Sequence, residues 1–256
     1  MIGVVGLGLI GGSIFKSLTS LGYDVCAVSN SMQGILPNIS ADYNSLKDCK
    51  VVFVCSAMNK ALDVLDTLEH VVSSDTIVTD VCSLKTFVCE KERPYVFIPS
   101  HPMAGTELRG FENSFDGLFK GAKWVLTPCF PVKKEDREFL EKIITDMGAK
   151  IVTTTPKDHD AAVALISHMP MVLSQALFLA ASENDLAMEI AASGFRDMTR
   201  LAMSNEEMAC DMVSMNADNI QNAILKLYKS MGDLTGKNYP QIISKIKAQR
   251  SEMFNN

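Results

Sequence analysis

Clustered basic residues, paired cysteines and metal-ligand spacings are missing from this chain of 256 residues. Its 24 Lys and Arg are scattered and its formal net charge is −6, so it has no basic face for binding a nucleic-acid duplex. Its seven cysteines are an odd set without Cys-x-x-Cys spacing, which argues against a disulfide framework or a zinc site. We therefore expect reduced thiols, no bound metal and no nucleic-acid partner.

Signal-peptide and membrane-span features are also lacking. The apolar opening segment, residues 1–15, has neither a basic n-region nor a small-residue cleavage site before Lys16. The apolar stretch 163–181 contains two serines, a histidine, a proline and a glutamine, which a membrane span tolerates poorly. We expect a mature, soluble protein of the cytoplasm without membrane contact.

Apolar runs and helical patterns alternate through the first part of the chain. With 47% hydrophobic residues, a chain of this length can bury roughly 70% of its unfolded surface. Short runs rich in Val, Ile and Phe predict strands buried on both faces of a mostly parallel sheet. These runs are 2–5, 24–28, 51–55, 76–80, 95–98, 124–127 and 150–153. The predicted fold class is α/β, a doubly wound Rossmann-type sheet with right-handed crossovers.

A second, all-helical part follows Thr155. The segment Thr155-Pro-Lys-Asp158 has the sequence of a helix start, and no strand pattern occurs after it. We expect a dinucleotide-binding domain over 1–154 and a helical substrate and dimerisation domain over 155–256. Pro170 should kink the first helix of that domain around His168. Because a helical array of this size rarely makes a self-sufficient core, we predict a homodimer.

A glycine-rich turn directly follows the first predicted strand. Gly6-Leu7-Gly8-Leu9-Ile10-Gly11 matches the G-x-G-x-x-G pattern and precedes an amphipathic helix. In this pattern Gly6 permits a tight turn, Gly8 lets the backbone approach a pyrophosphate, and Gly11 allows close packing of the helix. The helix N-terminus adds free N–H groups, so these six residues predict a dinucleotide site.

The end of the second predicted strand leaves the form of the cofactor open. NAD-binding folds usually place an acid there to bind the adenosine ribose, but this chain has Ser29 and Asn30. An uncharged edge would not repel a 2′-phosphate, yet no arginine is present to bind one. We therefore expect NAD or NADP as cofactor, with Ser29 and Asn30 among the residues that bind it.

Two polar segments follow the fourth and fifth predicted strands, where ligands gather in an open α/β sheet. The first runs from Asp80 to Lys85 and includes Ser83. The second runs from Ser100 to Glu107 and includes His101. We expect His101 to lie on a loop, where packing does not require a histidine, and to be catalytic.

Further candidates lie in the helical part. His159 and His168 are nine residues apart on one predicted helix, so at most one faces the site, and His168 beside the proline is favoured. Arg196 and Arg200 have i, i+4 spacing, which would place two guanidinium groups on one helix face to bind a carboxylate. The alternative is that the two arginines lie on the surface and pair with acidic neighbours.

Together these segments closely resemble the prephenate and arogenate dehydrogenase family of tyrosine biosynthesis. The resemblance rests on GLGLIGGS (6–13), Asp-x-x-Ser-x-Lys (80–85), HPMAGTE (101–107), Ser-His-x-Pro (167–170) and GFRDMTR (194–200). It extends over nearly the whole chain. HPMAGTE after the fifth strand is quite specific, whereas many dehydrogenases share the glycine motif.

The resemblance implies oxidative decarboxylation of prephenate to 4-hydroxyphenylpyruvate with hydride transfer to NAD(P)+. Arogenate, which would give tyrosine directly, is the alternative substrate. By the same resemblance, His101 draws the proton from the C4 hydroxyl of the ring and Ser83 shares that hydrogen bond. Arg200 would bind a substrate carboxylate, with Glu107 and His168 in the rest of the pocket. A histidine suits proton transfer because its unperturbed pKa is about 6.5.

The sequence departs from the family pattern at three places. Met171 stands where a second histidine is common, residues 56–59 lack a common proline, and the ribose acid is missing. This length has no room for a chorismate mutase segment or a regulatory domain, so we expect a monofunctional enzyme. Two other readings stay open. A β-hydroxyacid dehydrogenase would use a catalytic lysine in the helical part, and a nucleotide sensor without chemistry would be expected to lose His101 or Arg200.

Overall fold

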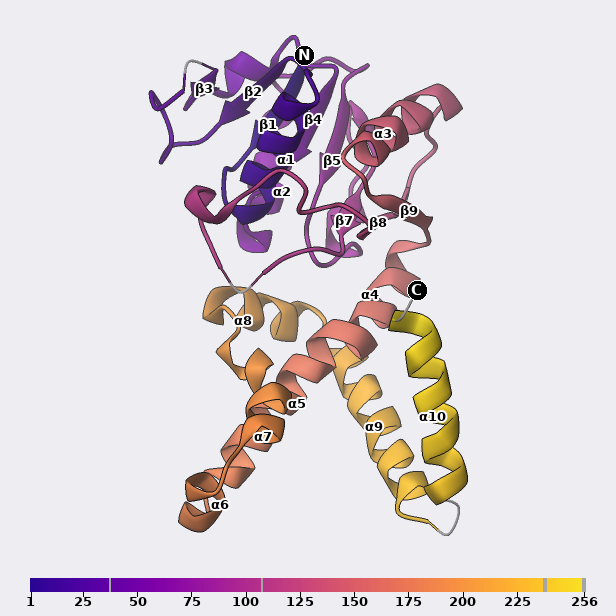
Figure 1. Cartoon of the computed structure of the whole chain (residues 1–256). Helices are drawn as coiled ribbons and strands as arrows, with labels where there is room; N and C mark the ends of the chain where they lie inside the picture. Colours follow the sequence, from indigo (N-terminus) through magenta and orange to yellow (C-terminus); the bar gives the residue numbers. More distant parts are fainter. Residues whose placement is uncertain (37, 107, 237–238, 255–256) are drawn as a thin grey trace.

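A six-stranded parallel sheet forms the upper part of the molecule in the computed structural model, which describes residues 1–36, 38–106, 108–236 and 239–254 (Figure 1). Its strand order is β3-β2-β1-β4-β5-β6, so the order reverses at the central strand β1. The strands are β1 (Ile2–Val5), β2 (Val25–Val28), β3 (Ile39–Ser40), β4 (Val51–Val54), β5 (Ile77–Asp80) and β6 (Val96–Phe97). This arrangement confirms the predicted Rossmann-type sheet, whose ligands bind at the reversal point. The predicted runs 124–127 and 150–153 do not belong to it but form strands of a separate sheet.

Burial on both faces explains the uninterrupted apolar strands. Val4 packs into one hydrophobic cluster and its neighbour Val5 into a second cluster on the other face, with 0% and 3% of their surfaces exposed. Successive strand residues point to opposite faces, so a strand covered on both sides favours apolar residues at successive positions. Helices α1 (Leu9–Ser20), α2 (Met58–Leu68) and α3 (Lys134–Asp146) belong to this part (Figure 1).

A second, three-stranded sheet joins the first to the helical part. It contains β7 (Ser100–Pro102), β8 (Lys123–Leu126) and β9 (Lys150–Thr153), with β7 antiparallel to β8 and β8 parallel to β9. The prediction that His101 lies on a loop is therefore wrong, because His101 pairs with Val125 in this sheet. A strand of three residues is too short to show a sequence pattern, and its partner lies far along the chain.

The C-terminal part contains only helices within the described residues, and these form two splayed legs (Figure 1). They are α4 (Pro156–Val163), η4 (Ala164–His168), α5 (Met169–Ala181), α6 (Asp185–Glu189), α7 (Ser193–Met198), η5 (Arg200–Met203), α8 (Glu206–Met215), α9 (Ala217–Leu234) and α10 (Tyr239–Phe254). α4, η4 and α5 make one continuous rod in which η4 is a π-helical turn just before Pro170. The proline thus perturbs the helix where the sequence predicts a kink. The division into domains at 154 and 155 stays a prediction.

Two glycines of the first turn have no room for a side chain. Gly6 has φ +87°, and a Cβ there would lie 2.8 Å from the backbone oxygen of Cys55. A Cβ on Gly11 would lie 1.9 Å from the backbone oxygen of Gly6. Gly8, by contrast, has no atom within 4 Å of the position of a Cβ. The turn is therefore packed tightly against the protein at two glycines and open at the third.

The packing around these glycines predicts different costs for the same substitution. We expect Gly11→Ala to lower the free energy of unfolding by about 2 kcal/mol or more, because the backbone of the turn must move. Gly8→Ala, the matched control, should cost about 1 kcal/mol or less. Urea denaturation followed by circular dichroism measures both. Equal losses for the two variants would contradict this account of the turn.

Candidate active site

A cavity of about 600 Å³ opens beside the glycine turn, at the carboxyl ends of β1, β2 and β4. Its wall includes Gly6, Leu7, Gly8, Ser29 and Asn30 from the predicted cofactor residues. The remaining three, Leu9, Ile10 and Gly11, begin helix α1 and do not line the cavity.

The cavity has polar groups suited to a dinucleotide. Gly8 is the N-cap of α1 and supplies no side chain, so the first-turn N–H groups of the helix are left for an anion. The Ser56 hydroxyl, also in the wall, is buried without a hydrogen-bond partner in the described part of the chain. Open backbone at Gly8 and an unpaired hydroxyl are what a bound pyrophosphate and ribose need.

His101 begins a chain of three side chains at the start of the helical part. Nδ1 of His101 lies 2.9 Å from Nε2 of His159, and Nδ1 of His159 lies 2.8 Å from a carboxylate oxygen of Asp160. His159 and Asp160 are both buried on α4. Sequence analysis favoured His168 over His159, but His159 is the residue in contact with His101.

The hydrogen-bond chain determines which nitrogen of each ring carries a proton. Asp160 accepts hydrogen bonds from the backbone N–H groups of Lys85 and Thr86 at 2.8 and 2.9 Å, so its carboxylate also accepts from Nδ1–H of His159. Nε2 of His159 then carries a lone pair and accepts from Nδ1–H of His101. The remaining nitrogen, Nε2 of His101, is left as a proton acceptor.

Burial and neighbouring charge keep His101 unprotonated. Burial, followed by the positive charge of Lys85, lowers the pKa of His101 well below its usual 6.5. Burial alone would raise the pKa of Asp160, but hydrogen bonds from His159, Thr86 and Lys85 outweigh it and lower that pKa. An ionised Asp160 and a neutral His101 are the states that proton acceptance requires.

A buried ion pair supports the strand that holds His101. Lys85 donates to the carboxylate of Asp80 and, at 2.6 Å, to the backbone oxygen of Ser100, and both charged side chains are 0% exposed. The Ser100 hydroxyl donates to the backbone oxygen of Asp80 at 2.8 Å and accepts from Trp124 at 2.9 Å. These bonds connect the end of β5 to β7 and β8, and they fix the residue directly before His101.

His168 occupies a different buried position. Its Nδ1 lies 3.1 Å from the amide nitrogen of Asn216, which also donates to the backbone oxygen of Asp160 at 3.0 Å. Burial lowers the pKa of His168 to about 4. Asn216 sits at the break between α8 and α9. No sequence motif pointed to this residue.

The other predicted site residues that the structure describes form no hydrogen bond with His101. Ser83, after β5, is half-buried, and its hydroxyl makes no hydrogen bond with another described residue. Arg196 is exposed on α7 beside Asp197, and Arg200 is exposed in η5. Because α7 ends between them, the two arginines lie in separate elements and not on one continuous helix as their spacing predicted. Glu107 lies outside the described residues.

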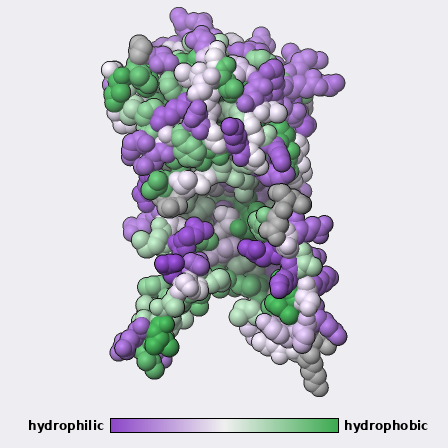
Figure 2. All heavy atoms as spheres, in the orientation of Figure 1, coloured by the Kyte–Doolittle hydropathy of each residue, from purple (hydrophilic) through white to green (hydrophobic). Residues whose placement is uncertain are grey.

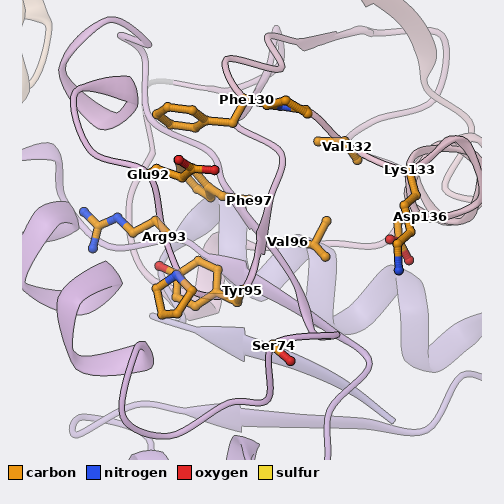
Figure 3. Close-up of a pocket in the computed structure, with 12 residues that line it drawn as sticks. Ser74, Glu92, Arg93, Tyr95, Val96, Phe97, Phe130, Val132, Lys133 and Asp136 are labelled. Atoms are coloured by element: carbon orange, nitrogen blue, oxygen red, sulfur yellow. The ribbon is translucent and has the colours of Figure 1, made fainter.

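A second, smaller cavity of about 170 Å³ contains none of the predicted site residues. It lies beside β6, with Tyr95, Phe97 and Phe130 in its wall. Figure 3 shows the guanidinium of Arg93 directed away from the hollow. That group pairs with Asp66 and, at 2.7 Å, with Glu69. The positive charge of Arg93 is therefore already paired with acidic side chains of the fold.

Comparison with known proteins agrees with the fold and the segments described above. Residues 18–153 match the family described as "Prephenate dehydrogenase, nucleotide-binding domain", and residues 155–250 match "Prephenate dehydrogenase, dimerization domain". The chain belongs to the prephenate dehydrogenase family. The resemblance drawn from the sequence motifs is thus confirmed.

Individual members of the prephenate dehydrogenase family resemble the chain along most of its length. Prephenate dehydrogenase of Bacillus subtilis is 31% identical over 85% of this chain, which spans 64% of that relative. The crystal structure of Synechocystis arogenate dehydrogenase is 31% identical, covers 98% of both chains and has a TM-score of 0.83. Prephenate dehydrogenase of A. aeolicus, in complex with hydroxyphenyl propionate and NAD+, is 26% identical, with a TM-score of 0.87 over 98% of this chain and 97% of that one.

The buried ion pair predicts a large loss of stability when one partner is removed. Lys85→Met should lower the free energy of unfolding by about 3–5 kcal/mol, because the Asp80 carboxylate stays buried without its cation. Lys150→Met, at an exposed position on β9, should change it by about 0.5 kcal/mol or less. Urea denaturation tests both variants, and a loss below about 1 kcal/mol for Lys85→Met would show that the pair is dispensable.

Proposed function

We propose that the protein is an NAD(P)-dependent prephenate dehydrogenase that converts prephenate to 4-hydroxyphenylpyruvate. The main support for this proposal is the hydrogen-bonded chain of His101, His159 and Asp160, which leaves Nε2 of His101 as a proton acceptor. We call the part of the site around His101 the reaction end. Asp80, the last residue of β5, and Ser100, which begins β7 shortly after β6, fix this end. Parallel strands end at one edge, so this acceptor and the dinucleotide cavity share one side of the sheet.

The chemistry follows from this arrangement. NAD(P)+, when bound in the cavity, supplies the acceptor for the hydride that leaves C4 of the substrate ring. His101 takes the proton of the C4 hydroxyl through Nε2, and His159 and Asp160 orient its ring and stabilise the imidazolium that forms. The bond from the ring to its carboxylate breaks, CO₂ leaves, and its electron pair completes the aromatic ring. Aromatisation makes the overall reaction strongly downhill.

The remaining predicted residues complete this proposal. We assign Ser83 to the hydroxyl that His101 deprotonates, and Arg200, with Arg196 and Glu107, to the carboxylate end of the substrate. Arg200 makes no ion pair with another described residue, so its guanidinium is available to a ligand. His168, which is hydrogen-bonded to Asn216, is assigned to the rest of the substrate pocket.

Arogenate is the second candidate substrate. The Synechocystis structure, at 31% identity, is an arogenate dehydrogenase, and prephenate and arogenate differ in a keto or amino group away from the reacting ring carbon. No residue identified in the site distinguishes these groups. Comparing kcat/KM for the two substrates decides between them.

We propose that the protein works in the cytoplasm as a homodimer assembled through its helical part. The rod Pro156–Ala181 is long and apolar enough to cross a membrane, and 33% of its most apolar segment is buried within the chain. Most of this apolar segment is therefore left without a covering. Figure 2 shows apolar side chains on the leg formed by α5, α6 and α7, where Leu179, Leu186 and Ile190 are 68%, 63% and 70% exposed. Such a surface needs a cover, and the matching family domain is a dimerization domain.

Light scattering tests the homodimer. At micromolar concentration we expect a mass of about twice 28.0 kDa, because the apolar legs of two copies cover one another. A monomeric mass would contradict the dimer, and the exposed apolar surface would then need another explanation.

Replacing His101 tests the reaction. His101→Ala should lower turnover by about 10²–10⁴-fold, the usual effect of removing a general base, with little change in dinucleotide affinity. His70→Ala, at an exposed position after α2, is the matched control and should keep full activity. Absorbance at 340 nm with prephenate and cofactor gives the rates. An equal loss of dinucleotide binding in His101→Ala would mean that the histidine is structural.

A further inference from the structure

The cavity beside the glycine turn brings a lysine to the place where the cofactor's ribose is expected. Lys60, in the first turn of α2, lines the same cavity as Ser29, Asn30 and Ser31, which follow β2. Sequence analysis found no arginine there for a 2′-phosphate. It could not find Lys60, because the lysine comes from the helix after β4, on the other side of β1.

The turn after β2 is rich in donors and has no acid. The hydroxyls of Ser29 and Ser31 share a hydrogen bond of 3.4 Å, and the backbone N–H of Ser29 donates to the backbone oxygen of Ser40. One hydroxyl proton of this pair and the Asn30 amide are therefore left for a ligand. An acid at this place would accept hydrogen bonds from the ribose diol of NAD and repel a phosphate. Hydrogen-bond donors without an acid therefore favour a 2′-phosphate over the free ribose diol.

The charged side chains around the cavity also favour a phosphate. Among the described residues that line it, the charged side chains are Lys60 and Glu112. Lys60 is exposed and makes no ion pair with another described residue, so its ammonium is available to an anion. Glu112 belongs to η3 (Phe111–Asn113), where the backbone oxygen of Phe111 accepts from Lys16 of α1 at 3.2 Å. Glu112 therefore lies on the side of helix α1 and not on the turn after β2.

We propose that this cavity selects the 2′-phosphorylated dinucleotide, NADP, with Lys60 as the charge that binds the 2′-phosphate and the side chains of Ser29, Asn30 and Ser31 as its hydrogen-bond donors. This inference rests on the proposed function and narrows its cofactor. An ammonium on a flexible stem binds phosphate as a point charge, so Lys60 can take the role that arginine has in other folds.

Calorimetric titration of the full chain with 2′,5′-ADP and 5′-AMP isolates the 2′-phosphate without any turnover. We expect 2′,5′-ADP to bind at least about tenfold more tightly than 5′-AMP, and NADP+ more tightly than NAD+, because the 2′-phosphate adds hydrogen bonds to a charged group. The preference should shrink as salt is added, because the lysine is exposed.

Variants identify the residues. Lys60→Ala should weaken 2′,5′-ADP by about tenfold and leave 5′-AMP within about twofold, whereas Lys60→Arg should retain the preference. Ser29→Asp should reverse it in favour of NAD+. Lys150→Ala removes an exposed lysine on another sheet and should change neither affinity.

Each contrary result has a distinct meaning. Equal binding of the two nucleotides, or tighter binding of NAD+ by the unaltered protein, would overturn the selectivity for NADP while leaving the proposed dehydrogenase intact. Equal weakening of both nucleotides by Lys60→Ala would place Lys60 against the adenosine and overturn its assigned role. Absence of binding by NAD+ and NADP+ alike would overturn the proposed function itself.

Discussion

The buried pair of Lys85 and Asp80 is the interaction on which the reaction end of the molecule depends. Both side chains are fully removed from water, which is tolerable only because each charge has its partner and Lys85 also donates to Ser100. Through Ser100 the pair connects the last residue of β5 to the strand that carries His101. A network of Lys85, Asp80 and Ser100 thus positions His101, the proposed base, although none of these three residues is proposed to react.

Asp160 extends this network into the helical part. Its carboxylate accepts from the backbone of Lys85 and Thr86 in the first part and from His159 in the second, so one side chain connects the two. Asn216 donates to the backbone oxygen of Asp160 from a third segment. Because His159 lies on α4, any movement of the helical part relative to the sheet alters the position of His159 against His101. Positioning and proton affinity therefore depend on the same contacts.

The two ends of the proposed site have opposite electrostatic requirements. At the nucleotide end, an uncapped helix and the ammonium of Lys60 favour anions. At the reaction end, burial and the charge of Lys85 disfavour a second positive charge and keep His101 neutral. A parallel sheet allows both, because its strands end side by side while each strand contributes its own following segment. One edge thus holds an anion site and a neutral base.

Features that depend on neighbours along the chain could be predicted from the order of residues alone. Apolar runs buried on both faces, the glycine turn and the helix start at Thr155 each follow from local steric and solvation rules, and the structure has them. The motif that includes His101 also singled out that residue. The contact of His101 with His159, its place in β7, the contact of Asn216 with Asp160 and the position of Lys60 at the cavity follow from the folded chain and were not predicted. These contacts join segments far apart in sequence, and three-residue strands, helix breaks and π-helical turns leave no periodic signal. Their positions are set by packing of the whole chain, which no local pattern encodes.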